Sequence, residues 1–433
     1  MAESQPNKSA FPLPSLLLLL TIIYISVYFL VFKPLDLHTS SFGGSPILAA
    51  EKVEKGYTLL APYNRLLTDK KGWKGNIYLI DLYGHPVHSW STNHQALYSV
   101  LKKNGNLLTV MEIPKYSQLF PPGGNTGIIQ ELDWNSKVVW EYKNERMHHD
   151  IAPLPNGNVA VAQWEAIPEA IAAQLQGGVE GSTLPTKITW SDEIVELDRN
   201  GKVVWSWHSH EHMDPIVDTL TPLMPKYAWS FINGLKFMEK NPIDGSPAYL
   251  ASMRSISTVV IIRKSDGEIL WRSPKGMLNA QHDPTLLTNG NILVFDNGLD
   301  RIPAPFAMYG SRVVEINPKT NKAVWQFDGG MGVIDKVKFM SAIVGGAQRL
   351  SNGNTLITDG ARGHIFEVTQ KGELVWDLVS TYTTEKTGAF PNNFLFKTRR
   401  YTEEEIEWPE KLQPSLSNNQ LKLHGLLKKI YPN

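Results

Sequence analysis

The sequence predicts an all-β fold, a six-bladed β-propeller, preceded by one N-terminal transmembrane helix. Three observations lead to this prediction: tryptophans recur at similar spacing, Asn-Gly and Asp-Gly turns join short β-branched runs, and the N-terminus is uncharged and apolar. They divide the 433 residues into an anchor (1–33), a linker (34–55), a propeller (56–401) and a tail (402–433).

The N-terminal stretch is long enough to cross a membrane. Residues 9–32 carry no charge and are mostly apolar, and about 20 such residues span a hydrocarbon core as a helix. Lys33-Pro34 follows where a cleaved signal peptide would show small residues, so an uncleaved anchor is favoured over a cleaved leader. Because the anchor precedes the long domain, we expect a single-pass membrane protein with its bulk on the exported side, whether periplasmic, extracellular or lumenal.

The stretch after the anchor reads as a linker. Residues 34–55 contain the polar run Thr39-Ser40-Ser41 and the turn-forming run Gly43-Gly44-Ser45-Pro46. Their composition predicts no contribution to a hydrophobic core.

From Lys55 onward the chain repeats. Two β-branched runs around an Asn-Gly or Asp-Gly turn, as in residues 194–205 and 259–271, are a strong hairpin signal, and each pair ends at a tryptophan. A second hairpin signal, Asn-Gly-Asn, follows at residues 104–106, 156–158, 289–291 and 352–354. Two hairpins make one four-stranded blade. The tryptophan spacings of 50, 65, 66, 54 and 51 residues fit propeller blades, so six blades are expected at Trp90, Trp140, Trp205, Trp271, Trp325 and Trp376.

The last repeat has no second Asn-Gly-Asn after Trp376. A strand within residues 56–62 is therefore expected to complete a blade and close the ring. The segment beyond Tyr382 is expected to lie outside the repeat and to pack on a face of the propeller. The tryptophans themselves are expected to pack blade against blade, without a role in ligand stacking.

Composition excludes several classes of function. The chain has 42 basic and 42 acidic side chains, which leaves no electrostatic footprint for nucleic acid. It has no cysteine, so disulfides, thiolate nucleophiles and cysteine-ligated metals are excluded. The alternating run His208-Ser209-His210-Glu211-His212 could hold a metal if it formed a strand, but ordinary loop histidines are the favoured interpretation. No cofactor and no metal are expected.

Chemistry is expected seven residues before each Asn-Gly. His149-Asp150 and His282-Asp283 occupy that position in two repeats. In a propeller the ends of the inner strands converge on the central channel, so these histidines can meet around one ligand. A single histidine there could simply satisfy buried backbone, but its recurrence favours a shared functional site.

These residues resemble the PAPS-independent arylsulfotransferases, six-bladed propellers that move a sulfuryl group between phenols through a sulfohistidine. The resemblance runs from about Gly56 to Tyr401. The matching segments are residues 148–150 with 154–158, 281–284 with 287–291, 295–298, 311–315 and 347–356.

The resemblance implies roles for individual residues. His282 matches the nucleophile, His149 a second active-site histidine, and Arg254 the sulfate-clamping arginine. The family's His-x-Asn element aligns with Phe231-Ile232-Asn233, so the asparagine is kept and the histidine is lost. The resemblance implies a catalytic role for Asn233, which together with Arg254 would donate to the sulfuryl oxygens.

The substitution at Phe231 leaves three interpretations open: an active transferase with a rearranged site or another acceptor, an inactive relative that only binds, or an element misplaced by a few residues. A phenyl ring could also stack on an aryl substrate. Phe231, His148 and Asp283 are the expected substrate contacts.

The function expected from the resemblance is transfer of a sulfuryl group from an aryl sulfate to a phenol, independent of PAPS, by a membrane-anchored enzyme. The expected partners are small aryl sulfates and phenols. The N-terminal helix would anchor the protein in the membrane, and no nucleic-acid partner is expected. The alternative is a catalytically inactive, membrane-tethered propeller that binds a protein or a carbohydrate. A quinone-dependent dehydrogenase is a weaker third option, since those propellers also use tryptophan-rich repeats.

Overall fold

The computed structural model describes residues 46–63, 75–113, 119–299, 301, 310–329, 339–382, 394–409 and 412. The predicted anchor, most of the predicted linker and most of the predicted tail lie outside these residues. Within the described part of the chain, no helix is both long enough and apolar enough to span a membrane.

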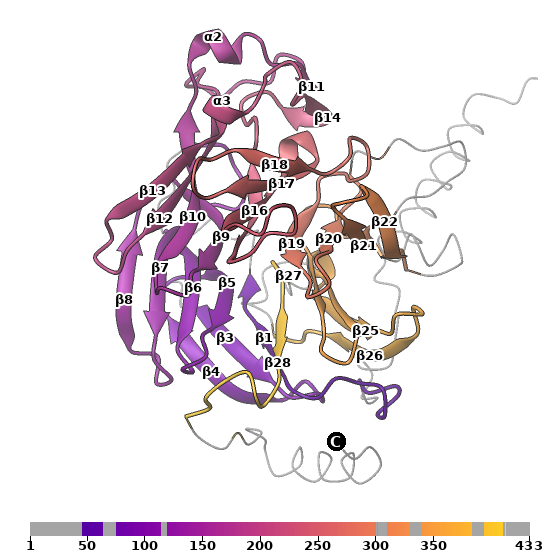
Figure 1. The fold of residues 1–433 in the computed structure, drawn as a ribbon. Helices are drawn as coiled ribbons and strands as arrows, with labels where there is room; N and C mark the ends of the chain where they lie inside the picture. The colour runs from indigo at the N-terminus through magenta and orange to yellow at the C-terminus, as the bar shows by residue number, and fades with distance from the viewer. Residues whose placement is uncertain are drawn as a thin grey trace, which may run out of the picture. The chain divides into compact units, whose positions relative to one another are not determined.

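The described residues form six four-stranded antiparallel sheets around a common axis, which confirms the predicted six-bladed propeller (Figure 1). The inner strands are largely buried, whereas the outer strand β8 (Val138–Lys143) has no buried residue. From the inside outward the blades are β28 (Arg399–Tyr401), β1 (Tyr57–Leu60), β3 (Gly75–Ile80) and β4 (Pro86–Thr92); β5 (Ala96–Leu101), β6 (Leu107–Glu112), β7 (Gly127–Leu132) and β8; β9 (Met147–Pro153), β10 (Val159–Ala166), β12 (Trp190–Leu197) and β13 (Val203–His208); β15 (Ile232–Met238), β16 (Ala248–Met253), β17 (Thr258–Arg263) and β18 (Ile269–Arg272); β19 (His282–Leu286), β20 (Ile292–Asp296), β21 (Arg312–Asn317) and β22 (Lys322–Phe327); and β23 (Gly346–Arg349), β24 (Thr355–Asp359), β25 (His364–Val368) and β26 (Leu374–Val379).

The six recurring tryptophans join each blade to the next one. Each lies on the outermost strand of its blade, and its indole N–H donates a hydrogen bond to the turn between the outer two strands of the following blade. The ring is closed in the same way, because Trp376 of the sixth blade bonds the first blade. The six bonds run from Trp90 to Asp133 O (3.2 Å), Trp140 to Arg199 O (2.8 Å), Trp205 to Lys264 O (2.8 Å), Trp271 to Asn321 Oδ1 (2.7 Å), Trp325 to Gln370 O (2.8 Å) and Trp376 to Leu82 O (2.7 Å).

The ring closes through strands from both ends of the chain. As expected, a strand near Gly56 takes part: β1 pairs with β3 on one side and with β28 on the other. The sixth repeat already has four strands of its own, so the N-terminal strand completes the first blade and not the last. The expectation that the chain beyond Tyr382 lies outside the repeat is wrong for residues 399–401, which form the innermost strand of the first blade.

The described part of the predicted linker packs on the sixth blade. Ile47 forms a bridge with Trp376, and the N–H of Leu48 bonds the carbonyl of Val375 at 2.9 Å. Ile47 and Val53 are buried in the core cluster that surrounds Trp376. From residue 46 onward this segment therefore contributes to a core, although its composition predicted none.

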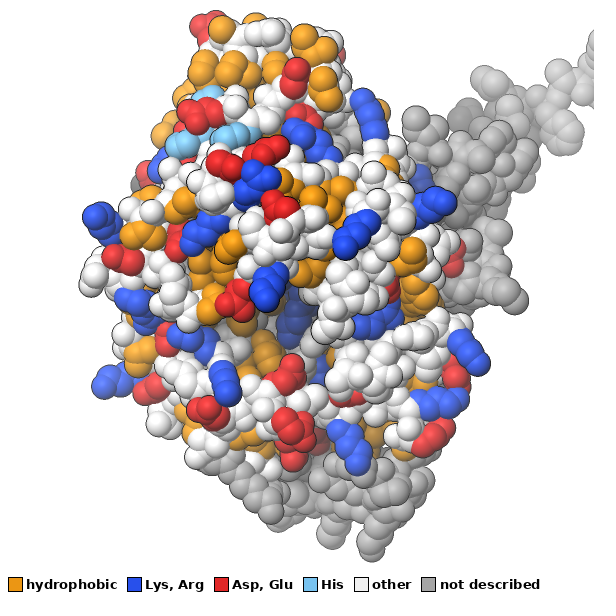
Figure 2. Space-filling model, viewed as in Figure 1, with side chains coloured by type: hydrophobic (Ala, Val, Ile, Leu, Met, Phe, Trp, Pro, Cys, Tyr) orange, Lys and Arg blue, Asp and Glu red, His pale blue; other side chains and the backbone are white. Residues whose placement is uncertain are grey.

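A lobe projects from the third and fourth blades (Figure 1). It contains α2 (Glu169–Ala172), a parallel pair of strands, β11 (Gly177–Val179) and β14 (Leu220–Pro225), and α3 (Ser209–His212). Figure 2 shows apolar side chains over this lobe, and Ile216, Val217 and Leu223 are among the exposed ones.

The histidine run 208–212 does not form a strand. His208 ends β13 and the next four residues form α3, so the three imidazoles do not share one strand face. The Nδ1 atoms of His208 and His210 lie 2.8 and 3.2 Å from the Glu165 carboxylate, while His212 stacks on Trp207 at 5.2 Å. No group of three or more potential metal ligands occurs among the described residues.

Candidate active site

The repeated His-Asp position is where the inner strands break their regular pairing. The ladder between β9 and β10 skips His149 and Asp150, and the ladder between β19 and β20 skips Asp283. His149 and Asp283 have left-handed φ angles of 58° and 51°. A bulge of this kind redirects side chains, so neighbouring residues no longer alternate strictly between the two faces of the strand.

The tautomer of His282 follows from its partner. Its Nδ1 lies 2.7 Å from Oδ1 of Asn297, and the Nδ2 of Asn297 donates to the carbonyls of Ser341 and Val344 at 2.5 and 2.9 Å. Those two donations assign Oδ1 as the amide oxygen, which only accepts. His282 therefore carries its proton on Nδ1, and Nε2 presents a lone pair without a hydrogen-bond partner among the described residues.

His282 is held in its neutral form. The pKa of His282 is lowered to about 3, mainly by burial and next by the charge of Arg254, while the hydrogen bond to Asn297 opposes this shift. Only 1% of the residue is exposed. A buried, neutral imidazole with a fixed lone pair has the properties that a nitrogen nucleophile needs.

The same pKa predicts a loss of stability in acid. The unfolded chain takes up a proton at His282 near pH 6.5, but the folded chain does so only near pH 3. The stability that this residue contributes is therefore complete above pH 6.5 and is lost as the pH falls toward 3. Between pH 7 and 5 we expect His282 alone to remove about 2 kcal/mol from the free energy of unfolding. Urea unfolding of the wild type and of His282→Gln at both pH values measures this, and an equal loss in both proteins would contradict it.

His149 lies between His148 and the channel. The two Nδ1 atoms are 2.9 Å apart, and Phe231 contacts the His149 ring at 4.8 Å between centroids. A Cβ on Gly124 would lie 2.1 to 2.3 Å from Nε2, Cε1 and Cδ2 of His149, so only glycine fits over the face of this ring. Because the three distances are nearly equal, Gly124 lies over the face of the ring. Burial, followed by the charges of His148, His282 and Arg254, holds the pKa of His149 well below its ordinary value.

The remaining predicted residues converge on these histidines. The guanidinium of Arg254 lies 5.7 Å from the centre of the Phe231 ring, and its charge lowers the pKa of both histidines. The Phe396 ring lies 6.2 Å from His149 and 6.1 Å from His282. The predicted cluster of His149, His282, Arg254 and Phe231 is therefore brought together at one end of the inner strands.

Asn233 contributes indirectly. It is fully buried, and its Nδ2 donates to the carbonyl of Gln281 at 2.8 Å. That bond links the fourth blade to the residue immediately before His282. The amide therefore positions the strand that carries His282, which differs from the catalytic role that the resemblance implies.

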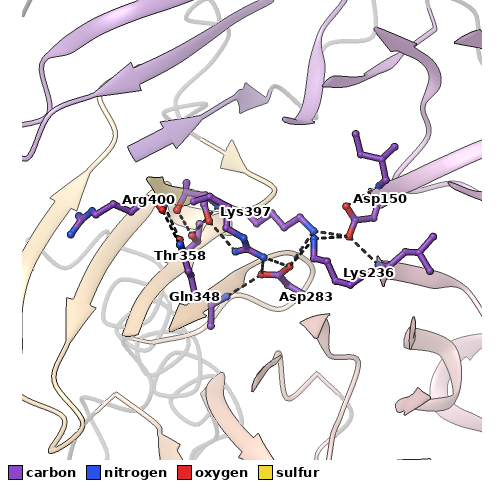
Figure 3. Close-up of polar contacts among 12 residues, drawn as sticks. Asp150, Lys236, Asp283, Gln348, Thr358, Lys397 and Arg400 are labelled. Atoms are coloured by element: carbon purple, nitrogen blue, oxygen red, sulfur yellow. Dashed lines mark hydrogen bonds and ion pairs between the residues drawn. The ribbon is translucent and has the colours of Figure 1, made fainter. Parts of the chain in front are cut away.

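The two aspartates of the repeated motif connect the inner strands of different blades (Figure 3). Asp150 accepts the N–H of Leu235 in the fourth blade at 3.0 Å, and Asp283 accepts the N–H of Ala347 in the sixth blade at 3.2 Å. Lys397 lies between them, with Nζ 2.6 Å from Asp150 and 3.1 Å from Asp283.

Arg399 completes this charge cluster. Its Nη2 lies 2.6 Å from both carboxylate oxygens of Asp283. Burial raises the pKa of Asp283, but Arg399 and Lys397 outweigh it and keep that pKa below its ordinary value. An ionised, fully paired carboxylate repels a sulfate, so the predicted substrate-binding role of Asp283 does not fit its surroundings.

His148 also lies away from the channel. It is 1% exposed and stacks on Trp164 at 4.1 Å between ring centroids, with His149 between it and the axis. The predicted direct contact of His148 with substrate therefore does not fit this arrangement either.

Three residues of the site were missed in the sequence. Asn297 lies in a matched segment but had been given no role, and Lys397 and Arg399 were assigned to a segment outside the repeat. The basic run from Lys397 to Arg400, in a stretch of otherwise weak pattern, was the only signal available.

A cavity of about 1510 Å³ lies elsewhere in the ring. It is lined by residues that include Glu54, Arg349, Asn352 and Trp408. Arg349 ends β23, whereas His282 begins β19, so this cavity opens at the opposite end of the inner strands from the histidines.

Several solved structures show a distant similarity to this one. A protein of unknown function from Bacteroides caccae has a TM-score of 0.47 and 15% identity and covers 80% of this chain and 100% of its own. The WD40 propeller domain of Doa1 has a TM-score of 0.38 and 10% identity, covering 75% and 86%. A catalytically inactive virginiamycin B lyase from Staphylococcus aureus with quinupristin has a TM-score of 0.40 and 10% identity, covering 76% and 91%. None of the curated proteins matches the chain.

One family model matches, and it does so over most of the propeller. The model described as Arylsulfotransferase (ASST) covers residues 100–381, which run from the second blade through the sixth and include His149, Arg254 and His282. The resemblance noted in the sequence is thereby confirmed, and the chain belongs to the arylsulfotransferase (ASST) family.

Proposed function

We propose that the protein is a PAPS-independent aryl-sulfate sulfotransferase that acts through a sulfohistidine on His282. The observation that carries the proposal is the state of His282: a buried, neutral imidazole whose Nδ1–H is held by Asn297 at 2.7 Å and whose Nε2 lone pair is left for reaction. The family supports sulfuryl transfer as the chemistry.

In the first step Nε2 of His282 attacks sulfur. The bond from sulfur to the aryl oxygen breaks, and its electron pair stays on the departing phenolate. Negative charge spreads over the sulfuryl oxygens during this transfer, and a cation aimed at them lowers the barrier. Arg254, which acts electrostatically on His282, is that cation in our proposal.

In the second step a phenol attacks the sulfohistidine and restores His282. The phenol must lose its proton as it attacks, which requires a base near the sulfur. His149 is the proposed base, because its charge is coupled to that of His282, and its strand β9, like β19, packs against β15. Phe231 offers an apolar face beside His149 and Arg254, and we propose that it contacts the aryl ring. These proposed roles of His149 and Phe231 favour an active transferase with a rearranged site over an inactive relative.

The proposal is tested by a pulse of 4-nitrophenyl sulfate without PAPS and without acceptor. We expect a burst of one nitrophenolate per protein molecule and a mass increase of about 80 Da, the mass of one sulfuryl group. Adding phenol should remove the added mass and yield phenyl sulfate. If several aryl sulfates give neither burst nor adduct with folded protein, the alternative of a non-catalytic binding propeller takes its place.

We further propose that residues 1–33 anchor the protein in a membrane with the propeller on the exported side. The uncharged stretch from residue 9 to 32 supports this. Extraction at alkaline pH should leave the full chain in the membrane fraction, and its release into the soluble fraction would exclude an integral anchor.

A further inference from the structure

Behind His149 lies a line of buried polar groups that the proposed reaction does not yet use. His148 Nδ1 is 2.9 Å from His149 Nδ1, and His148 Nε2 is 2.9 Å from Oδ1 of Asp192. The other carboxylate oxygen of Asp192 accepts hydrogen bonds from the Ser230 hydroxyl and from the N–H of Ile232, the latter at 3.1 Å. His148, His149 and Asp192 are each no more than 4% exposed.

Asp192 Oδ1 and His148 Nε2 depend on one another. The 2.9 Å contact between them is not a hydrogen bond, yet neither atom has another partner among the described residues. Buried polar atoms rarely remain unpaired. Two facing lone pairs would repel one another at this distance and a carboxylate has no proton to donate, so the arrangement requires a proton on Nε2 of His148.

This assignment leaves two states for the histidine pair. If His148 is neutral, its Nδ1 has a lone pair, so His149 donates from Nδ1 and its Nε2 is a base. If His148 is protonated on both nitrogens, it donates from Nδ1, so His149 accepts there and its Nε2 carries a proton. His149 is neutral in both states, but its Nε2 changes from acceptor to donor.

We propose that Asp192 and His148 form a proton relay that switches His149 between general acid and general base. This inference rests on the proposed sulfuryl transfer. In the first half-reaction Nε2–H of His149 protonates the departing phenolate, and Nδ1–H of His148 moves to Nδ1 of His149. In the second half-reaction the acceptor phenol gives its proton to Nε2 of His149, and the Nδ1 proton returns to His148. The relay releases one proton and recovers one, so the cycle balances.

The two imidazoles face different charges. His148 faces the Asp192 carboxylate and stacks on Trp164. His149 instead faces the charges of His282, Arg254 and Lys397 besides His148, all of which oppose its protonation. The Asp192 carboxylate therefore lies on the side of the pair to which the relay passes the proton.

The functional test uses Asp192→Asn and two donors. Nitrophenolate leaves without a proton, whereas phenolate from phenyl sulfate needs one. We expect adduct formation from 4-nitrophenyl sulfate to stay within about threefold of the wild type, and adduct formation from phenyl sulfate to fall about 10²-fold. The matched control is Ser230→Ala, which removes a hydrogen bond to the same carboxylate and leaves the relay in place. An equal loss with both donors, or an equal pattern in the control, would overturn the relay.

A second measurement does not depend on activity or on the variant folding. In the wild-type chain labelled with 15N-histidine, His148 Nε2 should carry a proton in every state, and the facing Nδ1 atoms should share a single proton. Loss of one resonance pair in His148→Gln assigns the signals among the 12 histidines. An unprotonated Nε2 on His148, or protons on both Nδ1 atoms, would overturn the relay even if His282 forms the adduct. If the adduct never forms but these protonation states are found, the proposed transfer fails, whereas the inferred proton positions on the histidine pair remain valid.

Discussion

His282→Ala is expected to abolish the covalent adduct and to reduce turnover of 4-nitrophenyl sulfate by about 10⁴-fold or more. The side chain supplies the bond-forming atom, and no change of solvent or of pH can replace it. Its removal also leaves Asn297 Oδ1 without the donor that lies 2.7 Å away. Because this loss is limited to one hydrogen bond, we expect the variant to fold. The measurement is intact mass after a pulse of donor, together with the nitrophenolate burst.

Two further variants make that result specific. His212→Ala removes an imidazole that stacks on Trp207 in the projecting lobe, far along the chain from the site, and should retain the adduct. Asn297→Ala keeps the imidazole but releases its Nδ1–H, so the adduct should still form, only more slowly, because the lone pair is no longer fixed on Nε2. If His282→Ala still gains the sulfuryl mass and His149→Ala does not, the nucleophile is His149 and the two roles must be exchanged.

The fold could be predicted because its strongest signal is local and repeated. Each tryptophan such as Trp205 stands at the same place in its blade and bonds the next blade's turn, so its spacing along the chain measures the size of a blade. Closure was harder to predict for a physical reason. β28 has three residues, no hairpin partner and no apolar period, and its pairing with β1 joins positions more than 300 residues apart.

The site could be predicted only in part. His149 and His282 lie at the channel because the offset from Asn-Gly reports position along the inner strand. The neighbours of these histidines could not be placed, since strict alternation assigns Asp150 and Asp283 to the opposite face, whereas the bulges turn both carboxylates toward Lys397. The tautomer of His282 and the pairing of His148 with Asp192 depend on contacts between blades, which no local pattern carries.

Arg400→Met is expected to lower the free energy of unfolding by about 3–5 kcal/mol, because it leaves the Glu367 carboxylate buried without its cation. Both side chains are fully buried, and their ion pair joins β28 of the first blade to β25 of the sixth. Arg400 also donates to Thr58 Oγ1 at 3.2 Å and to the Glu54 carbonyl at 3.1 Å, and its backbone pairs with the Gln348 side chain (Figure 3). Urea unfolding of the full chain measures the change.

The control for that variant is another ion pair between the C-terminal segment and the ring. Lys103 lies 3.9 Å from Glu407 with side chains 79% and 69% exposed, and Lys103→Met should cost less than about 1 kcal/mol. Adding Glu367→Gln to Arg400→Met removes the stranded charge but keeps an acceptor for the N–H of Glu54 and for Asn354, so part of the loss should be recovered. Such recovery would show that the cost arises from an unpaired charge at the closure. If Arg400→Met is instead no more destabilising than Lys103→Met, closure depends on the strand pairing of β28 alone, and the buried pair contributes only to the geometry that brings Lys397 and Arg399 onto Asp283.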